Sequence, residues 1–308
     1  MFWKRKSKKQ DGQEATDSAA EVAEDTTEET EDDAVASEDT AEGEETAEDK
    51  ATGAEAESGK DEDSDGVTEA DEADEAETRK AAKAEVEDEA DEAEEVGVTG
   101  PDSDGIIRVR TAGTFEFDGE KFDVINNTWI IEADKDGVVI IDPAHDAEAI
   151  MEAVGDREVY LVACTNAYST HIGAALAIAQ ETEADIALHP REMRAWRRIH
   201  GAEHRPEIDV EGEGALDIGD LHIDVLALPG TTSGTVGFYV SQLGAVFSGD
   251  TLRKGEPGMV GNTYIDYTTQ LASIGENLLS LPPDTRIFPD RGPSTSVEAE
   301  GRNFDSWV

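Results

Sequence analysis

The first hundred residues carry almost no large apolar side chains, so folding must be confined to the rest of the chain. Residues 1–100 hold 38 Asp and Glu against 10 Lys and Arg, and after Trp3 their apolar residues are Ala and a few Val. Such a segment cannot bury enough apolar surface to offset the conformational entropy that is lost on ordering. We therefore predict a disordered acidic tail over residues 1–105 and a folded domain over residues 106–308.

Composition and charge exclude several classes of protein. The net charge of −49 argues against nucleic acid as the partner. The single cysteine, Cys164, cannot form an internal disulfide and fits a reducing compartment. The sequence contains no run of 18 apolar residues, so no transmembrane helix is predicted. The basic residues 1–9 are followed by acidic residues and not by the apolar segment of a secretory signal. These features predict a cytoplasmic protein.

Apolar patterning over residues 106–308 predicts alternating strands and helices. Runs typical of strands occur at 106–110, 114–117, 122–124, 129–133, 138–141, 159–163, 186–188, 221–228, 236–240, 245–247 and 286–288. Helices are predicted at 147–154, 171–181, 190–200 and 268–281. The order of these elements predicts an α/β domain in which two sheets pack face to face with helices outside.

Five loops at the carboxyl ends of predicted strands carry polar residues, and catalytic groups of α/β proteins commonly lie at such ends. The loops span residues 141–144, 165–173, 229–235, 247–252 and 289–295. In order and spacing these five motifs resemble the metallo-β-lactamase superfamily, on the branch of the glyoxalase II-like hydrolases. The resemblance implies an αββα sandwich and a hydrolase with a dinuclear metal site.

The chain departs from the family's pattern at most of the positions that the resemblance assigns to metal ligands. Where the family has His, His, Asp and His in the second motif, this chain has Asn166, Tyr168, Thr170 and His171. Two further histidines are replaced by Thr231 and Arg291, whereas the bridging aspartate is kept as Asp250. A catalytic zinc needs about three protein ligands and a water, and a metal pair needs more. We therefore predict degenerate metal-binding motifs, no metal cofactor, and a non-catalytic binding or regulatory role.

The alternative is an active hydrolase of thioesters, esters or lactones. A rebuilt site for zinc, iron or manganese would combine His171 and Asp250 with other donors. The candidate donors are His145, Cys164, His189 and Asp290. A metal-free site would instead use a hydroxyl nucleophile, with His171 as the base and Asp250 to orient it. The candidate hydroxyls belong to Ser169, Thr231, Ser233 and Ser248.

Two groups of cations suggest what the protein binds. Arg291 either replaces the missing positive charge beside Asp250 or forms a salt bridge with it, because a guanidinium stays protonated. Arg191, Arg194 and Arg198 fall on one face of the predicted helix 190–200. That face is either solvated or docks an anionic ligand or the acidic tail itself. The predicted partners are therefore a small anionic molecule or a protein, together with an intramolecular contact of the tail.

Overall fold

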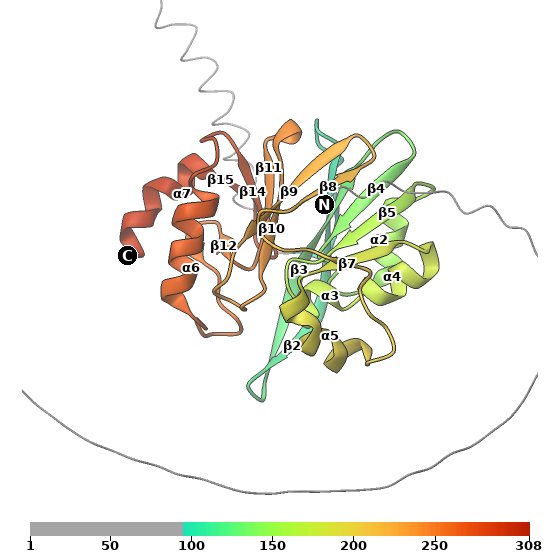
Figure 1. Ribbon diagram of the computed structural model, residues 1–308, viewed down its shortest axis with the longest axis horizontal. Coiled ribbons are helices and arrows are strands. Elements are labelled where there is room, and N and C mark those ends of the chain that lie inside the picture. Colours follow the sequence, from blue (N-terminus) through green and yellow to red (C-terminus); the bar gives the residue numbers. More distant parts are fainter. Residues whose placement is uncertain (1–94) are drawn as a thin grey trace, which may run out of the picture. The chain divides into compact units, whose positions relative to one another are not determined.

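Two β-sheets organise residues 95–308, the part of the chain that the computed structural model describes (Figure 1). The first sheet has seven strands in sequence order: β1 (Gly97–Thr99), β2 (Ile106–Phe117), β3 (Glu120–Glu132), β4 (Gly137–Ile141), β5 (Glu158–Ala163), β6 (Asp185–Leu188) and β7 (Ile208–Asp209). The second is ordered β15-β14-β11-β10-β9-β8, and its strands are β8 (Ala215–Ile218), β9 (Leu221–Ala227), β10 (Val236–Val240), β11 (Ala245–Gly249), β14 (Arg286–Pro289) and β15 (Thr295–Ser296). A separate ribbon pairs β12 (Leu252–Arg253) with β13 (Glu256–Pro257). The disorder predicted for residues 1–94 lies outside the described residues.

A long antiparallel hairpin of β2 and β3 crosses the first sheet, and the two strands pair along their whole length. Asp118 and Gly119 form the turn of the hairpin, and both residues have positive φ, 51° and 80°. These values suit a two-residue hairpin turn, whose twist matches that of the flanking strands. The sequence predicts four shorter strands here, because the stretches 111–113 and 125–128 interrupt the apolar alternation. Their backbones nevertheless continue the ladder.

Alternating side chains divide the core into layers. In β4, Val138 and Ile140 lie in a buried cluster with residues of the helices that cover the first sheet. Val139 and Ile141 lie in a second buried cluster, together with residues from the strands of the other sheet. Because successive strand residues point to opposite faces, β4 is apolar throughout and buried on both sides.

Helices cover the outer face of each sheet (Figure 1). They are α2 (Ala147–Val154), α3 (Ser169–Ile172), α4 (Ala175–Thr182) and α5 (Met193–His200) beside the first sheet, and α6 (Tyr267–Ser273) and α7 (Val297–Asn303) beside the second. Ile150 and Ile178 belong to the outer core of the first sheet, and Ile274 and Val297 to that of the second. The layers are helix, sheet, sheet and helix, which confirms the predicted αββα sandwich. Within residues 95–308 no helix has both the length and the apolar character needed to span a bilayer.

Three predicted helices are interrupted or modified in the structure. The helix predicted at 171–181 is divided into α3 and α4, because the amide of Ala174 donates to the carbonyl of Pro143 in a neighbouring loop. The helix predicted at 190–200 begins with a 3-10 turn, Pro190–Glu192, before α5. The helix predicted at 268–281 changes after α6 into a π-helical turn, Ile274–Leu278. Each predicted helical segment therefore exists, but these three contain a break or a change of helix type inside the predicted range.

Residues upstream of the boundary predicted at residue 106 already belong to the folded domain. Strand β1 pairs with β2, placing Val98 opposite Val109. The next residues are held by Arg286, whose guanidinium contacts the carboxylates of Asp102 at 2.7 Å and Asp104 at 2.6 Å. Residues 97–105, which the sequence assigns to the tail, are thus joined to both sheets.

Candidate functional site

Loops from both sheets meet at the carboxyl ends of β4, β5, β11 and β14, at the edge of the sandwich where α3 lies (Figure 1). The backbone amide of Thr165, after β5, donates to Asp142 Oδ1 after β4 at 2.7 Å. Asn166 Nδ2 donates across the sandwich to Asp250 Oδ1 after β11 at 2.9 Å. The sequence places its candidate site residues on these loops, and the structure brings the loops together.

Asp142 fixes the orientation of His171. Its Oδ2 accepts from Thr165 Oγ1 at 2.7 Å and contacts His171 Nδ1 at 2.9 Å. The other ring nitrogen, Nε2, is buried without a hydrogen bond and lies 3.7 Å from Asp250 Oδ2. Burial alone would lower the pKa of His171, but the charge of Asp142 and the interactions with both carboxylates raise that pKa well above its ordinary value. One carboxylate therefore faces each nitrogen of this buried ring.

Asp250 is the acceptor for two side chains that stand at family ligand positions. Its Oδ1 receives hydrogen bonds from Asn166 Nδ2 at 2.9 Å and from Thr231 Oγ1 at 2.7 Å. Thr231 Oγ1 also lies 3.0 Å from Thr235 Oγ1. All of these groups are nearly or fully buried. Asn166, Thr231, His171 and Asp250 thus form one hydrogen-bonded and ionic cluster.

Tyr168 and Thr170 leave this cluster and take packing positions. The Tyr168 hydroxyl donates to the Thr231 carbonyl at 3.0 Å, and burial raises its pKa. Its ring meets Phe115 and Phe117 of the hairpin edge to face, with centroids 5.7 Å and 6.1 Å away. Thr170 is buried within α3. The β2–β3 hairpin therefore covers one side of the site with aromatic rings.

Arg291 does not pair with Asp250 in the structure. Its Nε lies 3.4 Å from Asp290 Oδ2, and its terminal nitrogen donates to the Met259 carbonyl. The stronger partner of Asp290 is Arg253, which makes two hydrogen bonds to the carboxylate at 2.8 Å and 3.0 Å. Burial raises the pKa of Asp290, but the charges of Arg253 and Arg291 outweigh this effect and lower the pKa below 3.8.

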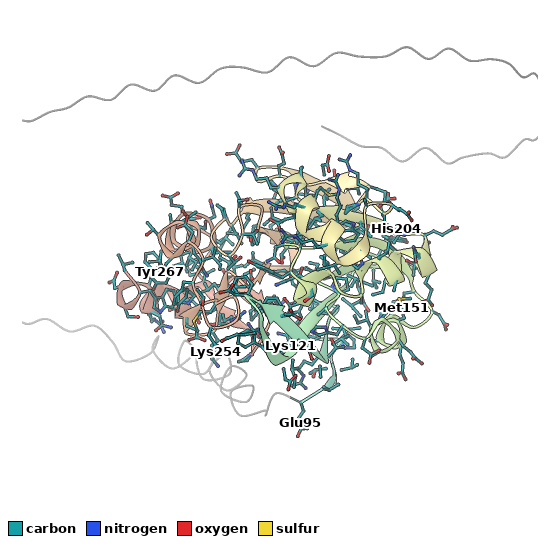
Figure 2. All side chains as sticks on the ribbon, turned by 90° about the horizontal axis from the view of Figure 1, so that it is seen from below. Glu95, Lys121, Met151, His204, Lys254 and Tyr267 are labelled. Atoms are coloured by element: carbon teal, nitrogen blue, oxygen red, sulfur yellow. The ribbon has the colours of Figure 1, made fainter. Side chains whose placement is uncertain are left out.

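An open cleft of about 810 Å³ lies between the hairpin and the loops of the second sheet. Its cationic lining comes from Lys254 and Arg291, together with the paired Arg253, whereas Asp123 and Glu256 line it with negative charge. Figure 2 views the domain from the hairpin side and labels Lys254 together with Lys121 near the hairpin tip. The cleft is large enough for a small molecule.

The donors considered for a rebuilt metal site lie apart or are committed elsewhere. His145 Nε2 contacts Asn126 at 3.2 Å, and His189 accepts a hydrogen bond from the amide of Arg191. Cys164 is fully buried, which raises the pKa of its thiol, and Asp290 is bound by Arg253. Within residues 95–308 no three His, Cys, Asp or Glu side chains are grouped so that they could hold a metal ion. The residues present therefore do not fit the family's dinuclear site.

The hydroxyls considered for a metal-free site are not aligned with His171. Thr231 donates to Asp250, and Ser248 donates to the Leu252 carbonyl at 3.0 Å. The hydroxyl that does contact the imidazole is that of Thr165, at 3.2 Å from Nδ1, the nitrogen already bound to Asp142. A nucleophile and its base need a direct hydrogen bond or a bridging water. In the described part of the chain, none of the candidate hydroxyls bonds to His171 Nε2.

The predicted arginines lie on α5 and the 3-10 turn before it, near the same loops. Arg191 and the helical Arg194 and Arg198 are exposed, and Arg191 donates to the Ser233 carbonyl at 3.2 Å. Beside Arg191, the buried Glu192 accepts hydrogen bonds from the amides of Ala167 and Gly234 and from a threonine hydroxyl. Glu192 therefore ties the loop of the second motif to the loop of the third.

Four residues of this site were not among the sequence candidates: Asp142, Thr165, Glu192 and Arg253. Asp142 and Thr165 were recognisable in principle, because both stand inside the motifs that carry the family resemblance. Glu192 lies within a helical pattern, and Arg253 lies 37 residues before its partner Asp290. No local signal in the sequence identifies either of these last two.

Comparisons with known proteins agree with the motifs. A family model described as the metallo-beta-lactamase superfamily matches residues 122–290. A probable metallo-hydrolase of Bacillus subtilis is 30% identical over 187 residues, which are 56% of this chain and 88% of that protein. A hydroxyacylglutathione hydrolase of Haemophilus influenzae is 28% identical over 192 residues, covering 58% of this chain and 90% of that protein.

Solved structures show the same architecture. The crystal structure of the BLEG-1 B3 metallo-beta-lactamase matches with a TM-score of 0.55 at 25% identity, covering 64% of this chain and all of that one. A metallo-beta-lactamase from Pontibacter korlensis matches with a TM-score of 0.56 at 17% identity, covering 69% of this chain and 99% of that one. Because its identity is so low, the second match supports the fold alone.

Proposed function

Since this chain belongs to the metallo-beta-lactamase superfamily, we propose that it is a hydrolase-like member that has lost its dinuclear metal site and acts as a non-catalytic binding or regulatory protein. Its curated relatives include a probable metallo-hydrolase and a hydroxyacylglutathione hydrolase, so a hydrolase is the ancestral expectation. Fold membership alone does not establish activity, which depends on the residues of the site.

The hydrogen bonding of Asp250 is the observation that carries this proposal. Its Oδ1 accepts hydrogen bonds from Asn166 and Thr231, which stand where the family has histidines. An amide nitrogen and a hydroxyl that donate to this carboxylate are poor substitutes for imidazole ligands. One imidazole and one carboxylate remain, fewer donors than a single catalytic zinc takes from protein.

The cleft beside the altered site supports a small anionic molecule as the ligand. Lys254 and Arg291 line it, and Arg291 carries a permanent charge. Gly292 also lines the cleft, and a Cβ there would meet no atom within 4 Å, so its backbone is open to close approach by a ligand. We place the protein in the cytoplasm, which the single buried and unpaired Cys164 supports.

Elemental analysis of the purified full-length chain tests the loss of the metal site. We expect far less than one zinc, iron or manganese ion per chain, and no turnover of a thioester or a lactone. Near-stoichiometric metal together with metal-dependent turnover would overturn the proposal in favour of a rebuilt site. Turnover without metal would favour a metal-free hydrolase.

Restoring the replaced ligands tests whether their loss is the cause. The variant combines Asn166→His, Tyr168→His, Thr170→Asp, Thr231→His and Arg291→His, and we expect it to bind zinc in equilibrium dialysis. The same variant with Asp250→Asn is the matched control, and it should bind zinc more weakly because the bridging carboxylate is lost. A folded restored variant without zinc affinity would show that more than the ligands has changed.

Binding of anions to the cleft is tested separately by NMR titration with inorganic phosphate and with citrate. We expect shifts of the amide signals of Gly113 and Gly292, and weaker binding in the variant Lys254→Gln, Arg291→Gln. The exposed Lys135→Gln variant is the control and should titrate like the natural chain. Shifts that are the same in both variants, or absent from these glycines, would argue against an anionic ligand.

A further inference from the structure

The outer face of α5 and the turn before it carry a group of exposed cations, which we call the arginine surface: Arg191, Arg194, Arg197 and Arg198. The last three have no side-chain hydrogen bond or ion pair within residues 95–308. The opposite side of the helix is anchored by Trp196, which is fully buried and donates its indole N–H to the His204 carbonyl at 2.8 Å. The arginines therefore stand on a fixed helix.

The arginine surface has the opposite charge to the rest of the domain. Residues 101–308 hold 36 Asp and Glu but 15 Lys and Arg, and four of those cations lie within residues 191–198. Clustered positive charge attracts an acidic partner, and neutralising several exposed arginines together requires a partner with closely spaced carboxylates. Residues 21–49 of the same chain supply 15 Asp and Glu and no Lys or Arg.

We propose that the arginine surface docks the acidic segment 21–49 of the same chain. The 45 residues that connect position 49 to Glu95 can extend to about 150 Å, whereas a domain of about 200 residues has a radius of gyration of about 17 Å. Figure 2 shows Glu95 and His204, just after α5, on opposite sides of the view, and the connecting length suffices to pass around the domain. Tethering gives the segment a local concentration of the order of millimolar, so individually weak ion pairs suffice.

Docking at this place would connect the acidic segment to the altered site. Arg191 donates to the Ser233 carbonyl, and its neighbour Glu192 holds the amide of Gly234. Both contacts are made to the loop that carries Thr231. A segment bound to the arginine surface therefore lies next to a loop of the candidate site.

Paramagnetic NMR on the full-length chain tests the contact. Cys164 is fully buried, so a nitroxide label can be attached selectively to the variant Ser37→Cys. At about 0.02 M salt we expect the amide signals of residues 194–198 to lose most of their intensity, while signals of α6 keep theirs. At about 0.5 M salt the Debye length falls to about 4 Å, and the intensities on α5 should recover.

A matched pair of variants assigns the effect to the arginines. Arg194→Gln, Arg197→Gln and Arg198→Gln together should abolish the loss of intensity on α5. Lys121→Gln, Lys135→Gln and Arg302→Gln remove the same charge from other exposed positions and should leave the loss unchanged. Undiminished signals on α5 at low salt in the natural background, or an equal effect in both variants, would overturn the proposal.

A mixing experiment separates docking within one chain from docking between copies. Isotope-labelled protein without the nitroxide is combined with unlabelled Ser37→Cys protein that carries it. We expect the α5 signals to keep their intensity in this mixture, because each segment is held by its own domain. Intensity loss equal to that within the doubly labelled chain would assign the contact to a second copy and overturn the intramolecular proposal.

Discussion

Asp250 keeps a carboxylate in a nearly buried position because Asn166 and Thr231 donate to the same oxygen and His171 approaches the other. A buried charge without such partners costs far more free energy than an exposed one. The substitutions at the ligand positions are therefore mutually consistent: the groups that replace the histidines are the groups that satisfy the remaining aspartate. A metal-binding cluster has become a hydrogen-bonded cluster.

Thr231→Val tests this consistency at a single hydroxyl. Valine has the shape of threonine but cannot donate to Asp250, and a hydrogen bond to a charged group contributes about 1.5–3 kcal/mol. We expect the free energy of unfolding in urea to fall by about that amount. Thr231→Ser keeps the donor and should lose less. Equal losses in the two variants would show that packing of the methyl group, and not the hydrogen bond, stabilises the site.

The pair of Asp290 and Arg253 predicts a pH dependence. The folded pKa of Asp290 is lowered below 3.8, so its contribution to stability is complete above pH 3.8 and is lost as the pH falls below that value. Asp290→Asn leaves Arg253 without its carboxylate and should cost about 3–5 kcal/mol at neutral pH. The difference in free energy of unfolding between the two proteins should shrink below pH 3.8. The exposed Asp284→Asn is the control, and an Asp290→Asn difference that stays constant down to pH 3 would contradict the expectation.

At the scale of elements, the break between α3 and α4 depends on a close approach of two backbones. A Cβ on Gly173 would lie 2.0 Å from the Ala144 carbonyl oxygen, far inside contact distance. Gly173→Ala should therefore destabilise the fold by about 1–3 kcal/mol or more in urea, although alanine favours helices. Gly301→Ala in α7, where a Cβ meets nothing within 4 Å, is the matched control and should be neutral or slightly stabilising. A neutral Gly173→Ala would mean that the loop after β4 moves freely.

The elements that the sequence predicts well are those with a strong local pattern. Val138–Ile141 is a short apolar run that is buried on both faces, and the five motif loops follow strands as the family resemblance implies. The predicted helix at 171–181 was wrong in its continuity, because its break depends on the Pro143 carbonyl, about 30 residues away in sequence. The predicted contact of Arg291 with Asp250 does not form in the described structure, again because the outcome depends on residues distant in sequence. Spacing in sequence brings Arg291 to the site, but it does not reveal that Arg291 would pair with the charge of Asp290 and donate to the Met259 carbonyl.

At the scale of the whole molecule, the strong negative charge destabilises the folded domain but favours docking of the acidic segment on the arginine surface. Like charges on the domain repel one another and oppose the compact state, while an acidic segment is attracted to the arginine surface. Salt screens both effects. The repulsion acts over the entire surface, whereas the attraction is confined to one helix, so stability and docking should respond to salt in opposite directions.

Thermal unfolding in potassium chloride tests the repulsion. Residues 101–308 carry 36 acidic against 15 basic residues, so we expect the melting temperature to rise by several degrees between about 0.02 M and 0.5 M salt, since about 1 kcal/mol corresponds to 2–4 °C in a domain of this size. The variant Glu120→Gln, Glu152→Gln, Glu181→Gln removes three exposed negative charges and should melt higher at low salt and respond less to added salt. A melting temperature that falls with salt would mean that screening of exposed attractive pairs, such as Arg286 with Asp104, outweighs the relief of repulsion, and it would not involve the pair of Arg253 and Asp290. Because that pair is almost buried and therefore weakly screened, we expect its contribution to stay nearly constant across the titration.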